Sequence, residues 1–400
     1  MTVWISRRPD AEIAAEIESR GGDGHLAGLR LAVDETSDAA AVEALRTAGA
    51  VVVGTTHSAP VAVATGAADL AVAAAAGSRV PAAVHGIVAI APTAGVIIGQ
   101  ACRTVVFAPT LASADRATAV LAAAAPERSW PSDVRLAAAP APVVAIPEEL
   151  PELDGPGRAA FERAVDTLAA AGARIVRVGT SAFLAAHDLR DDALAVLDGA
   201  DALLVPAAYT TAAGPFGLCA VTVPTATAGD ARGSVTVVAR AFDDAVALAV
   251  AALLAGESPP AVWPLAGTKH VELVVFGAHL AGGPLAHQLT DRGARFAGEI
   301  TTAPRYRMTV LPTNPPKPGV TRVADGTAGS ALSGHRWLMS PAALGAFLAA
   351  LPAPMQLGKV EFADGSWRTG FGCDGSARGA DISGYGSWTN ALAAGAVEQT

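Results

Sequence analysis

The feature that most constrains the fold is a regular alternation of helical and strand patterns between about residues 30 and 255. Residues 39–48 carry apolar side chains at helical spacing, Gly49 ends this pattern, and the apolar run Val51–Val53 follows as a short buried strand. Helices that alternate with short apolar strands are typical of one sheet covered by helices. We therefore expect an α/β core in this part of the chain.

Further segments extend the pattern. The stretches predicted as strands are 86–91, 103–108, 142–146, 174–178, 202–205, 218–223 and 234–240, and those predicted as helices are 158–171 and 242–254. The alanine-rich runs Leu70–Ala76 and Ala245–Ala255 are shorter than the roughly 20 residues that a bilayer core requires. We expect both runs to be buried helices and the protein to contain no membrane span.

A change of composition marks a domain boundary. Glycine and prolines crowd residues 256–264, so we expect a first domain over 1–255, a linker over 256–270 and a second domain over 271–400. Beyond the linker, segments 271–276, 305–311 and 359–362 are predicted as strands. Ser340 and Pro341 combine a side-chain cap with a proline in the first helical turn, which predicts a helix start. The second domain is therefore expected to be a small α+β unit.

Charge and cysteine content exclude several classes of function. A net charge of −9 with dispersed arginines argues against nucleic acid, which requires a clustered basic face. Cys102, Cys219 and Cys373 are far apart, so neither a disulfide framework nor a zinc site is indicated, and no cofactor is expected. The N-terminus lacks the apolar region of a secretory signal. We expect a cytoplasmic protein with small-molecule or protein partners.

The segment Ala76-Gly77-Ser78-Arg79-Val80-Pro81-Ala82 resembles the nucleophile block of the amidase signature family, and the likeness over residues 30–108 is strongest to allophanate hydrolases of urea breakdown. In that family a strand ending in Val-Lys-Asp supplies a catalytic lysine, and a glycine- and serine-rich loop supplies a bridging serine. The resemblance implies an amidase-signature-like core, a mixed sheet covered by helices. It also implies a homodimer formed through this domain.

This chain departs from that pattern at both activating groups. Its only lysines are Lys269, Lys317 and Lys359, Asp34 stands where the family lysine is expected, and no glycine-serine loop follows His57. A serine hydroxyl is a weak nucleophile without a base to take its proton. We therefore expect a truncated domain in which the amidase step is lost. Ser78 is either a residual turn serine or a nucleophile activated by a histidine such as His57 or His85.

The second domain resembles the C-terminal domain of allophanate hydrolase along nearly its whole length. The matching blocks are 276–280, 284–290, 292–296, 301–307 and 315–319. The resemblance implies a fold similar to γ-glutamyl cyclotransferases, with a glycine-rich loop after the first strand facing a carboxylated ligand. In the family this domain is thought to promote decarboxylation of the N-carboxycarbamate that the amidase releases.

Candidate site residues follow from this likeness. Imidazole titrates near neutral pH, which makes His279 and His287 candidates for proton transfer. The loop that starts at Gly277 offers backbone N–H groups to an anion. Guanidinium groups pair well with carboxylates, and the substrate-binding candidates beside the loop are Arg292, Arg305, Tyr306 and Arg307. His335 stands where the family has an acidic residue.

Two functions of different classes remain open. The first is an allophanate hydrolase-like enzyme of urea or nitrogen metabolism whose C-terminal domain retains any catalysis. The second is a catalytically inactive pseudoenzyme that acts as a partner or regulator of a full-length amidase or a urea carboxylase. A weaker third is a hydrolase in which Ser78 acts on a different small amide.

Overall fold

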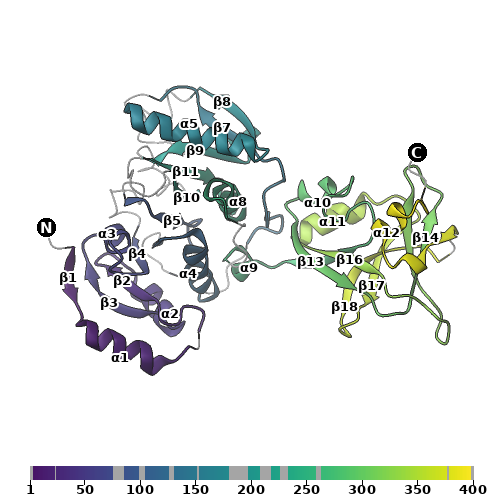
Figure 1. The fold of residues 1–400 in the computed structure, drawn as a ribbon, viewed down its shortest axis with the longest axis horizontal. Coiled ribbons are helices and arrows are strands. Elements are labelled where there is room, and N and C mark those ends of the chain that lie inside the picture. The colour runs from purple at the N-terminus through teal and green to yellow at the C-terminus, as the bar shows by residue number, and fades with distance from the viewer. Residues whose placement is uncertain are drawn as a thin grey trace. The chain divides into compact units, whose positions relative to one another are not determined.

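The structure is a computed structural model that describes residues 3–22, 24–74, 85–98, 104–125, 130–150, 153–179, 197–207, 218–225, 233–257, 263–375 and 378–397. The chain forms two compact units, the first from residues 1–131 and 140–268 and the second from residues 132–139 and 269–400. Figure 1 shows the sheet and covering helices of the first unit and the sheets of the second. Within the described ranges, no helix has the length and apolar character needed to cross a membrane.

The first unit is built on one mixed sheet of 11 strands, in the order β1-β3-β2-β4-β6-β5-β10-β11-β9-β7-β8. The strands are β1 (Trp4–Arg7), β2 (Arg30–Asp34), β3 (Val51–Thr56), β4 (Leu70–Ala74), β5 (Val88–Ala91), β6 (Thr104–Ala108), β7 (Val143–Pro147), β8 (Arg174–Val178), β9 (Ala202–Pro206), β10 (Cys219–Pro224) and β11 (Ser234–Ala239). Strand β2 pairs in parallel with β3 and β4, and β7 pairs in parallel with β8 and β9. The strands between these two groups pair antiparallel.

Helices cover both faces of this sheet (Figure 1). They are α1 (Asp10–Arg20), α2 (Ala39–Thr47), α3 (Ala59–Ala64), α4 (Leu111–Ala123), α5 (Gly155–Ala170), α8 (Asp244–Ala255) and α9 (Trp263–Gly267), with the 3-10 helix η2 (Leu197–Gly199). Side chains alternate along each strand, so Leu31 belongs to the core that α2, α4, α5 and α8 cover, whereas Ala32 belongs to the core on the other face, with residues of α1 and α3. The α/β core expected from the sequence, a mixed sheet covered by helices, is confirmed.

One predicted element is wrong. Residues Leu70–Ala76 were expected to form a buried helix, but Leu70–Ala74 form strand β4, paired with β2 on one side and β6 on the other. All five residues are buried. A central strand is apolar on both faces and shows no alternation, so periodicity cannot distinguish it from a buried helix. The other alanine-rich run is a helix as expected, α8.

The boundary between the two units does not coincide with the linker expected over residues 256–270. Helix α9 lies inside that segment, and Trp263 is fully buried in the core of the first unit. Its backbone N–H donates to Asp115 Oδ1 at 3.0 Å, and its ring centroid lies 6.0 Å from that of Trp130. Conversely, residues 132–139 pack with the second unit. A glycine- and proline-rich composition shows where helices break, but it does not show which core a single tryptophan joins.

Substitution of Trp263 therefore tests the packing of this segment. Trp263→Ala is expected to lower the free energy of unfolding of the first unit by about 3–5 kcal/mol, because it empties a fully buried site. Trp263→Phe is expected to cost much less, because the indole Nε1 has no hydrogen-bond partner among the described residues. Urea denaturation followed by circular dichroism measures both. Unchanged stability in Trp263→Ala would contradict the packing described here.

The second unit holds two smaller sheets. The five-stranded sheet has the order β13-β16-β12-β18-β17 and the three-stranded sheet the order β15-β14-β19. The strands are β12 (Val271–Val275), β13 (Arg295–Thr301), β14 (Tyr306–Leu311), β15 (Lys317–Arg322), β16 (Ser333–Met339), β17 (Met355–Glu361), β18 (Trp367–Cys373) and β19 (Ala380–Asp381), and the helices are α10 (His287–Thr290), α11 (Pro341–Ala349), η4 (Ser383–Tyr385) and α12 (Trp388–Ala393). Helix α11 starts as predicted, with the Ser340 side chain accepting the N–H of Ala343. The expected small α+β domain is confirmed.

Candidate functional site

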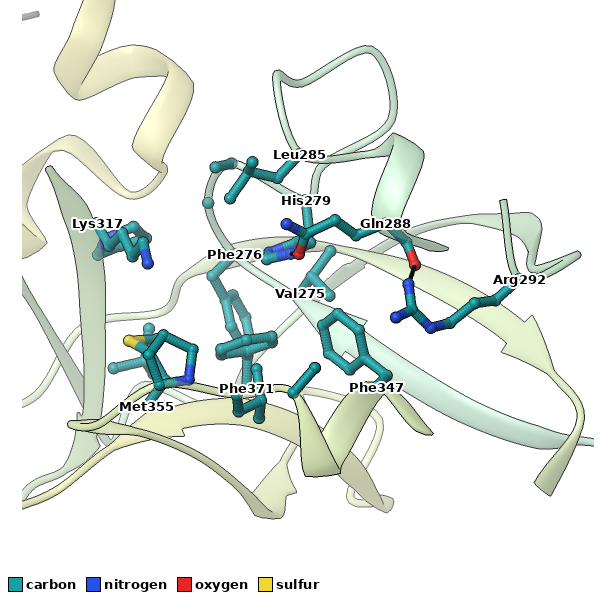
Figure 2. Close-up of a pocket in the computed structure, with 17 residues that line it drawn as sticks. Val275, Phe276, His279, Leu285, Gln288, Arg292, Lys317, Phe347, Met355 and Phe371 are labelled. Atoms are coloured by element: carbon teal, nitrogen blue, oxygen red, sulfur yellow. Dashed lines mark hydrogen bonds between the residues drawn. The ribbon is translucent and has the colours of Figure 1, made fainter. Parts of the chain in front are cut away.

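The second unit contains a cavity of about 340 Å³. The loop after β12, helix α10, the start of β15, the end of α11 and strand β18 line it, so segments distant in sequence meet there. Figure 2 shows His279 at the centre of the site, with Lys317 and Arg292 on opposite sides of it in this view. A cavity of this size fits a small molecule.

The polar lining of the cavity is cationic. Lys317 and Arg292 carry positive charges, and no carboxylate is among the described residues that line the cavity. Arg292 Nη1 donates to the backbone oxygen of Gln288 at 2.6 Å. Among the described residues, neither Lys317 nor Arg292 has a carboxylate partner. Two unpaired cations beside an apolar wall favour an anionic ligand, because a ligand carboxylate would supply the missing countercharge.

His279 is held in one orientation by polar and aromatic contacts. Its Nε2 lies 2.9 Å from Gln288 Oε1, so Nε2 donates and Nδ1 is left as an acceptor. Its ring stacks on Phe371 at a centroid distance of 5.3 Å and meets Phe347 edge-on at 5.2 Å. Burial, opposed in part by the Gln288 hydrogen bond, lowers the pKa of His279 below its ordinary 6.5, and the charges of Lys317 and His287 lower it further. His279 is therefore neutral at pH 7 in the absence of ligand.

The loop after β12 approaches the neighbouring strand too closely for any side chain at its first position. A Cβ atom added to Gly277 would lie 2.3 Å from Cγ and 2.5 Å from Cδ of Pro318. Internal hydrogen bonds fold the loop: Leu280 N–H donates to the Gly277 oxygen at 2.8 Å and Leu285 N–H to the Ala278 oxygen at 2.9 Å. Within the described part of the chain, the N–H groups of Gly277, Ala278 and His279 donate to no acceptor. Backbone donors of this kind suit an anion.

The predicted site residues divide into two groups. Gly277, His279 and Arg292 line the cavity. His287, the first residue of α10, is exposed outside the lining, and its Nδ1 lies 3.0 Å from the Pro284 oxygen.

The three candidates at the start of β14 also lie outside the lining and have other partners. The Tyr306 ring is buried, and its hydroxyl accepts the N–H of Glu361 at 2.7 Å. Arg305 Nη1 lies 3.5 Å from Asp325 Oδ1, and Arg307 Nε lies 3.2 Å from Asp381 Oδ2. These contacts join the start of β14 to β17, to the turn at Asp325 and to β19, as expected of residues that stabilise the second unit.

Sequence reasoning assigned no role to several residues of the cavity. Gln288 orients His279, Lys317 supplies a charge, and Phe347, Met355 and Phe371 form the apolar wall. The sequence contained a signal that could have identified Lys317 as a site residue, since it is one of three lysines and lies in a block that matches the family. The aromatic residues had none, because they come from α11 and β18, about 70 and 90 residues beyond the loop.

In the first unit, Ser78 lies outside the described residues. Asp34, at the end of β2, is largely buried, and its Oδ1 accepts the N–H of Thr36 at 3.0 Å and its hydroxyl at 2.7 Å. The Thr36 hydroxyl oxygen accepts the N–H of Ala74 at 3.1 Å. His57 is exposed, with Nδ1 3.1 Å from Glu35 Oε1. The described residues include no group of three His, Cys, Asp or Glu side chains that could hold a metal ion.

Comparisons with known proteins agree with this architecture. Residues 271–393 match the allophanate hydrolase C-terminal domain. The chain is 36% identical over 124 residues to urea amidolyase of Saccharomyces cerevisiae, a match that covers 30% of this chain and 7% of that protein. A match to urea amidolyase of Lachancea kluyveri is 36% identical over 106 residues and covers 26% and 6% of the two chains. The matches thus span less than a tenth of the length of these relatives.

Solved structures extend the likeness to the whole fold. Kluyveromyces lactis allophanate hydrolase superposes with a TM-score of 0.77 at 20% identity, over 98% of this chain and 93% of that one. The K. lactis urea amidolyase superposes with a TM-score of 0.79 at 21% identity, over 98% of this chain and 34% of that one. The second unit is thus an allophanate hydrolase C-terminal domain, and the first has the fold that precedes it in the solved enzyme. Residues 271–393 therefore belong to the allophanate hydrolase C-terminal domain family, and the chain as a whole shares the fold of the solved allophanate hydrolase.

Proposed function

We propose that the second unit binds N-carboxycarbamate, or a closely related carboxylated urea derivative, and promotes its decarboxylation in urea nitrogen metabolism. The observation that carries this proposal is the cavity itself, in which two cations and the half-buried His279 have no carboxylate beside them among the described residues. Lys317 and Arg292 would each bind one carboxylate of a dianion. The N–H groups at the start of the glycine-rich loop would support one of them.

The chemistry requires one proton at the central nitrogen. When the N–C bond to one carboxylate breaks, carbon dioxide leaves and the electron pair stays on nitrogen, which must take a proton to give carbamate. His279 is the titratable group at the centre of the cavity. A bound dianion would offset the charge of Lys317 and raise the pKa of His279, so binding would be coupled to proton uptake.

We further propose that the first unit has lost the amidase step, in which allophanate gives N-carboxycarbamate and ammonia. All three lysines of the chain lie in the second unit, so the first has no lysine amine to act as a base. The carboxylate of Asp34, at the expected position, is already engaged by Thr36. Both groups that activate the serine in the family, the lysine and the glycine-serine loop, are thus missing from the sequence.

One experiment tests both parts of the proposal. The purified protein is expected to release no ammonia from allophanate, and neither Ser78→Ala nor His287→Ala is expected to change that result. When an active amidase generates the intermediate in the same tube, bicarbonate formation is expected to be faster with this protein than without it, and His279→Asn is expected to remove the gain. Ammonia release that disappears in Ser78→Ala would show that the amidase step is retained.

The competing proposal is a pseudoenzyme that regulates an active amidase or a urea carboxylase. The hydrogen bonds of Asp34 with Thr36 favour this proposal too. A first unit without amidase activity is still a folded domain whose surface a partner can bind. It predicts a changed activity of the partner enzyme on addition of this protein. That change should persist in His279→Asn, whereas a decarboxylase effect should not.

A further inference from the structure

A histidine outside the cavity supports the tip of the glycine-rich loop. His335 lies in β16, and its Nδ1 accepts the backbone N–H of Ala281 at 2.9 Å. Ala281 follows the loop residues Gly277, Ala278 and His279, which line the cavity. The contact therefore joins a rigid strand of the five-stranded sheet to the segment that presents the backbone donors and His279.

The groups around His335 define its protonation state. From β13, Glu299 lies opposite His335 in the strand register with Oε1 3.7 Å from Nε2, and the Phe296 ring lies 5.1 Å away. From β12, the neighbour in register is the uncharged Val275, and the loop contributes the Ala281 N–H. Because Nδ1 accepts a hydrogen bond, the proton of the neutral ring is on Nε2, on the side of Glu299.

We propose that neutral His335 is a positioning residue that holds the glycine-rich loop in its ligand-binding form, and that protonation of His335 releases the loop. A proton on Nδ1 removes the only acceptor that the ring offers to Ala281 and sets two N–H groups against each other. The ligand-binding consequence rests on the proposed function of the cavity. The control of the loop by His335 does not depend on that proposed function.

The direction of the pH effect follows from burial. Desolvation lowers the pKa of His335 below its ordinary 6.5, and Glu299 opposes this in part. A histidine whose pKa is lower in the folded than in the unfolded protein stabilises the folded form at every pH above the unfolded-state pKa. This contribution is lost as the pH falls through the folded-state pKa. The loop is therefore held at neutral pH and released in acid, at a pH below 6.5.

Hydrogen exchange of the full-length protein tests the proposal without any ligand. Exchange of the loop N–H groups that donate hydrogen bonds, those of Leu280, Ala281 and Gly283, is expected to speed up about fivefold between pH 8 and pH 5 after correction for the intrinsic pH dependence of exchange, as loss of one hydrogen bond predicts. His335→Asn retains an acceptor near the position of Nδ1 but does not titrate, so its loop is expected to stay protected at both pH values. His270→Asn, at an exposed histidine before β12, is expected to behave as the wild type.

Two results would overturn the proposal. One is a wild-type loop whose corrected exchange does not change with pH. The other is the same change in His335→Asn, which would assign the effect to His279, the titratable residue within the loop.

Calorimetric titration with malonate, which replaces the central nitrogen of N-carboxycarbamate by a methylene, separates this proposal from the proposed function. Malonate affinity is expected to fall in acid in the wild type more steeply than in His335→Asn. A loop that responds as predicted in a protein that binds no malonate at any pH would support the role of His335 and count against the proposed ligand. Malonate binding with identical pH profiles in both proteins would support the ligand and overturn the role of His335.

Discussion

Replacing Lys317 with glutamate is expected to abolish malonate binding in the cavity. Lys317 is the first residue of β15, it lines the cavity, and its charge reaches His279, whose pKa it lowers. Lys317→Met, which removes the charge but keeps the length, is expected to weaken binding about 10- to 100-fold, as for loss of a charged hydrogen bond. Charge reversal sets a carboxylate against the ligand and adds a further penalty of several kcal/mol. Isothermal titration calorimetry at pH 7 measures both.

Lys359→Glu is the matched control. It changes the net charge by the same amount, and Lys359 is exposed on β17, outside the cavity, with Nζ 3.4 Å from Thr369 Oγ1. Its malonate affinity is expected to remain within about twofold of the wild type, because charges that far from the ligand in water are screened. Equal losses in both variants would show that only net charge matters. Wild-type affinity in Lys317→Glu would show that malonate binds elsewhere.

Much of the fold could be predicted because its signals are local. The strand predicted over residues 174–178 is β8 with the same bounds, and the Ser340-Pro341 pair marks the start of α11. A helix cap and a run of β-branched residues each act within a few positions of the chain. The failure at Leu70–Ala74 has the opposite cause, since only the strands on either side of β4 determine that these alanines are extended.

The candidate site could be predicted only in part, for the same physical reason. The glycine-rich loop and His279 are contiguous in sequence, so the family blocks point to them directly. Phe347 and Phe371 reach the cavity because α11 and β18 pack beside β12. The spacing of residues along the chain does not predict this packing. Arg305 and Arg307 show the converse, because they lie inside a matching block in sequence but pair with Asp325 and Asp381 outside the cavity. A pattern of residue types predicts chemistry, whereas the tertiary structure decides which groups share a site.

Side-chain hydrogen bonds join two strand ends of the first unit. Asp34 receives two hydrogen bonds from Thr36, whose hydroxyl accepts the N–H of Ala74 at the end of β4. These bonds join the carboxyl ends of β2 and β4 without any lysine. The contact between these two strand ends therefore needs no lysine, as our proposal of a first unit without the amidase step requires.

Gly277→Ala is expected to lower both the stability of the second unit and the affinity of the cavity. The added methyl group would lie 2.3 Å from Cγ of Pro318, a buried ring next to Lys317 in β15. Because a proline ring cannot rotate away, either the loop or β15 must move, at a cost of about 1–3 kcal/mol, as for overpacking of a core. Either movement also displaces the backbone donors of the loop or the Lys317 ammonium. Thermal unfolding and malonate titration measure the two effects.

Gly345→Ala gives the opposite expectation for the same chemical change. Gly345 lies within α11, and apart from its chain neighbours and the backbone of its own helix, no described atom lies within 4 Å of the position of an added Cβ. Alanine there is expected to raise the free energy of unfolding by about 0.5–1 kcal/mol, because it restricts the unfolded chain and favours the helix. Opposite signs of the two shifts in melting temperature would show that Gly277→Ala destabilises the protein because the methyl group meets Pro318, and not because a glycine is lost. Stabilisation by Gly277→Ala would mean that the loop does not approach β15 as closely as described.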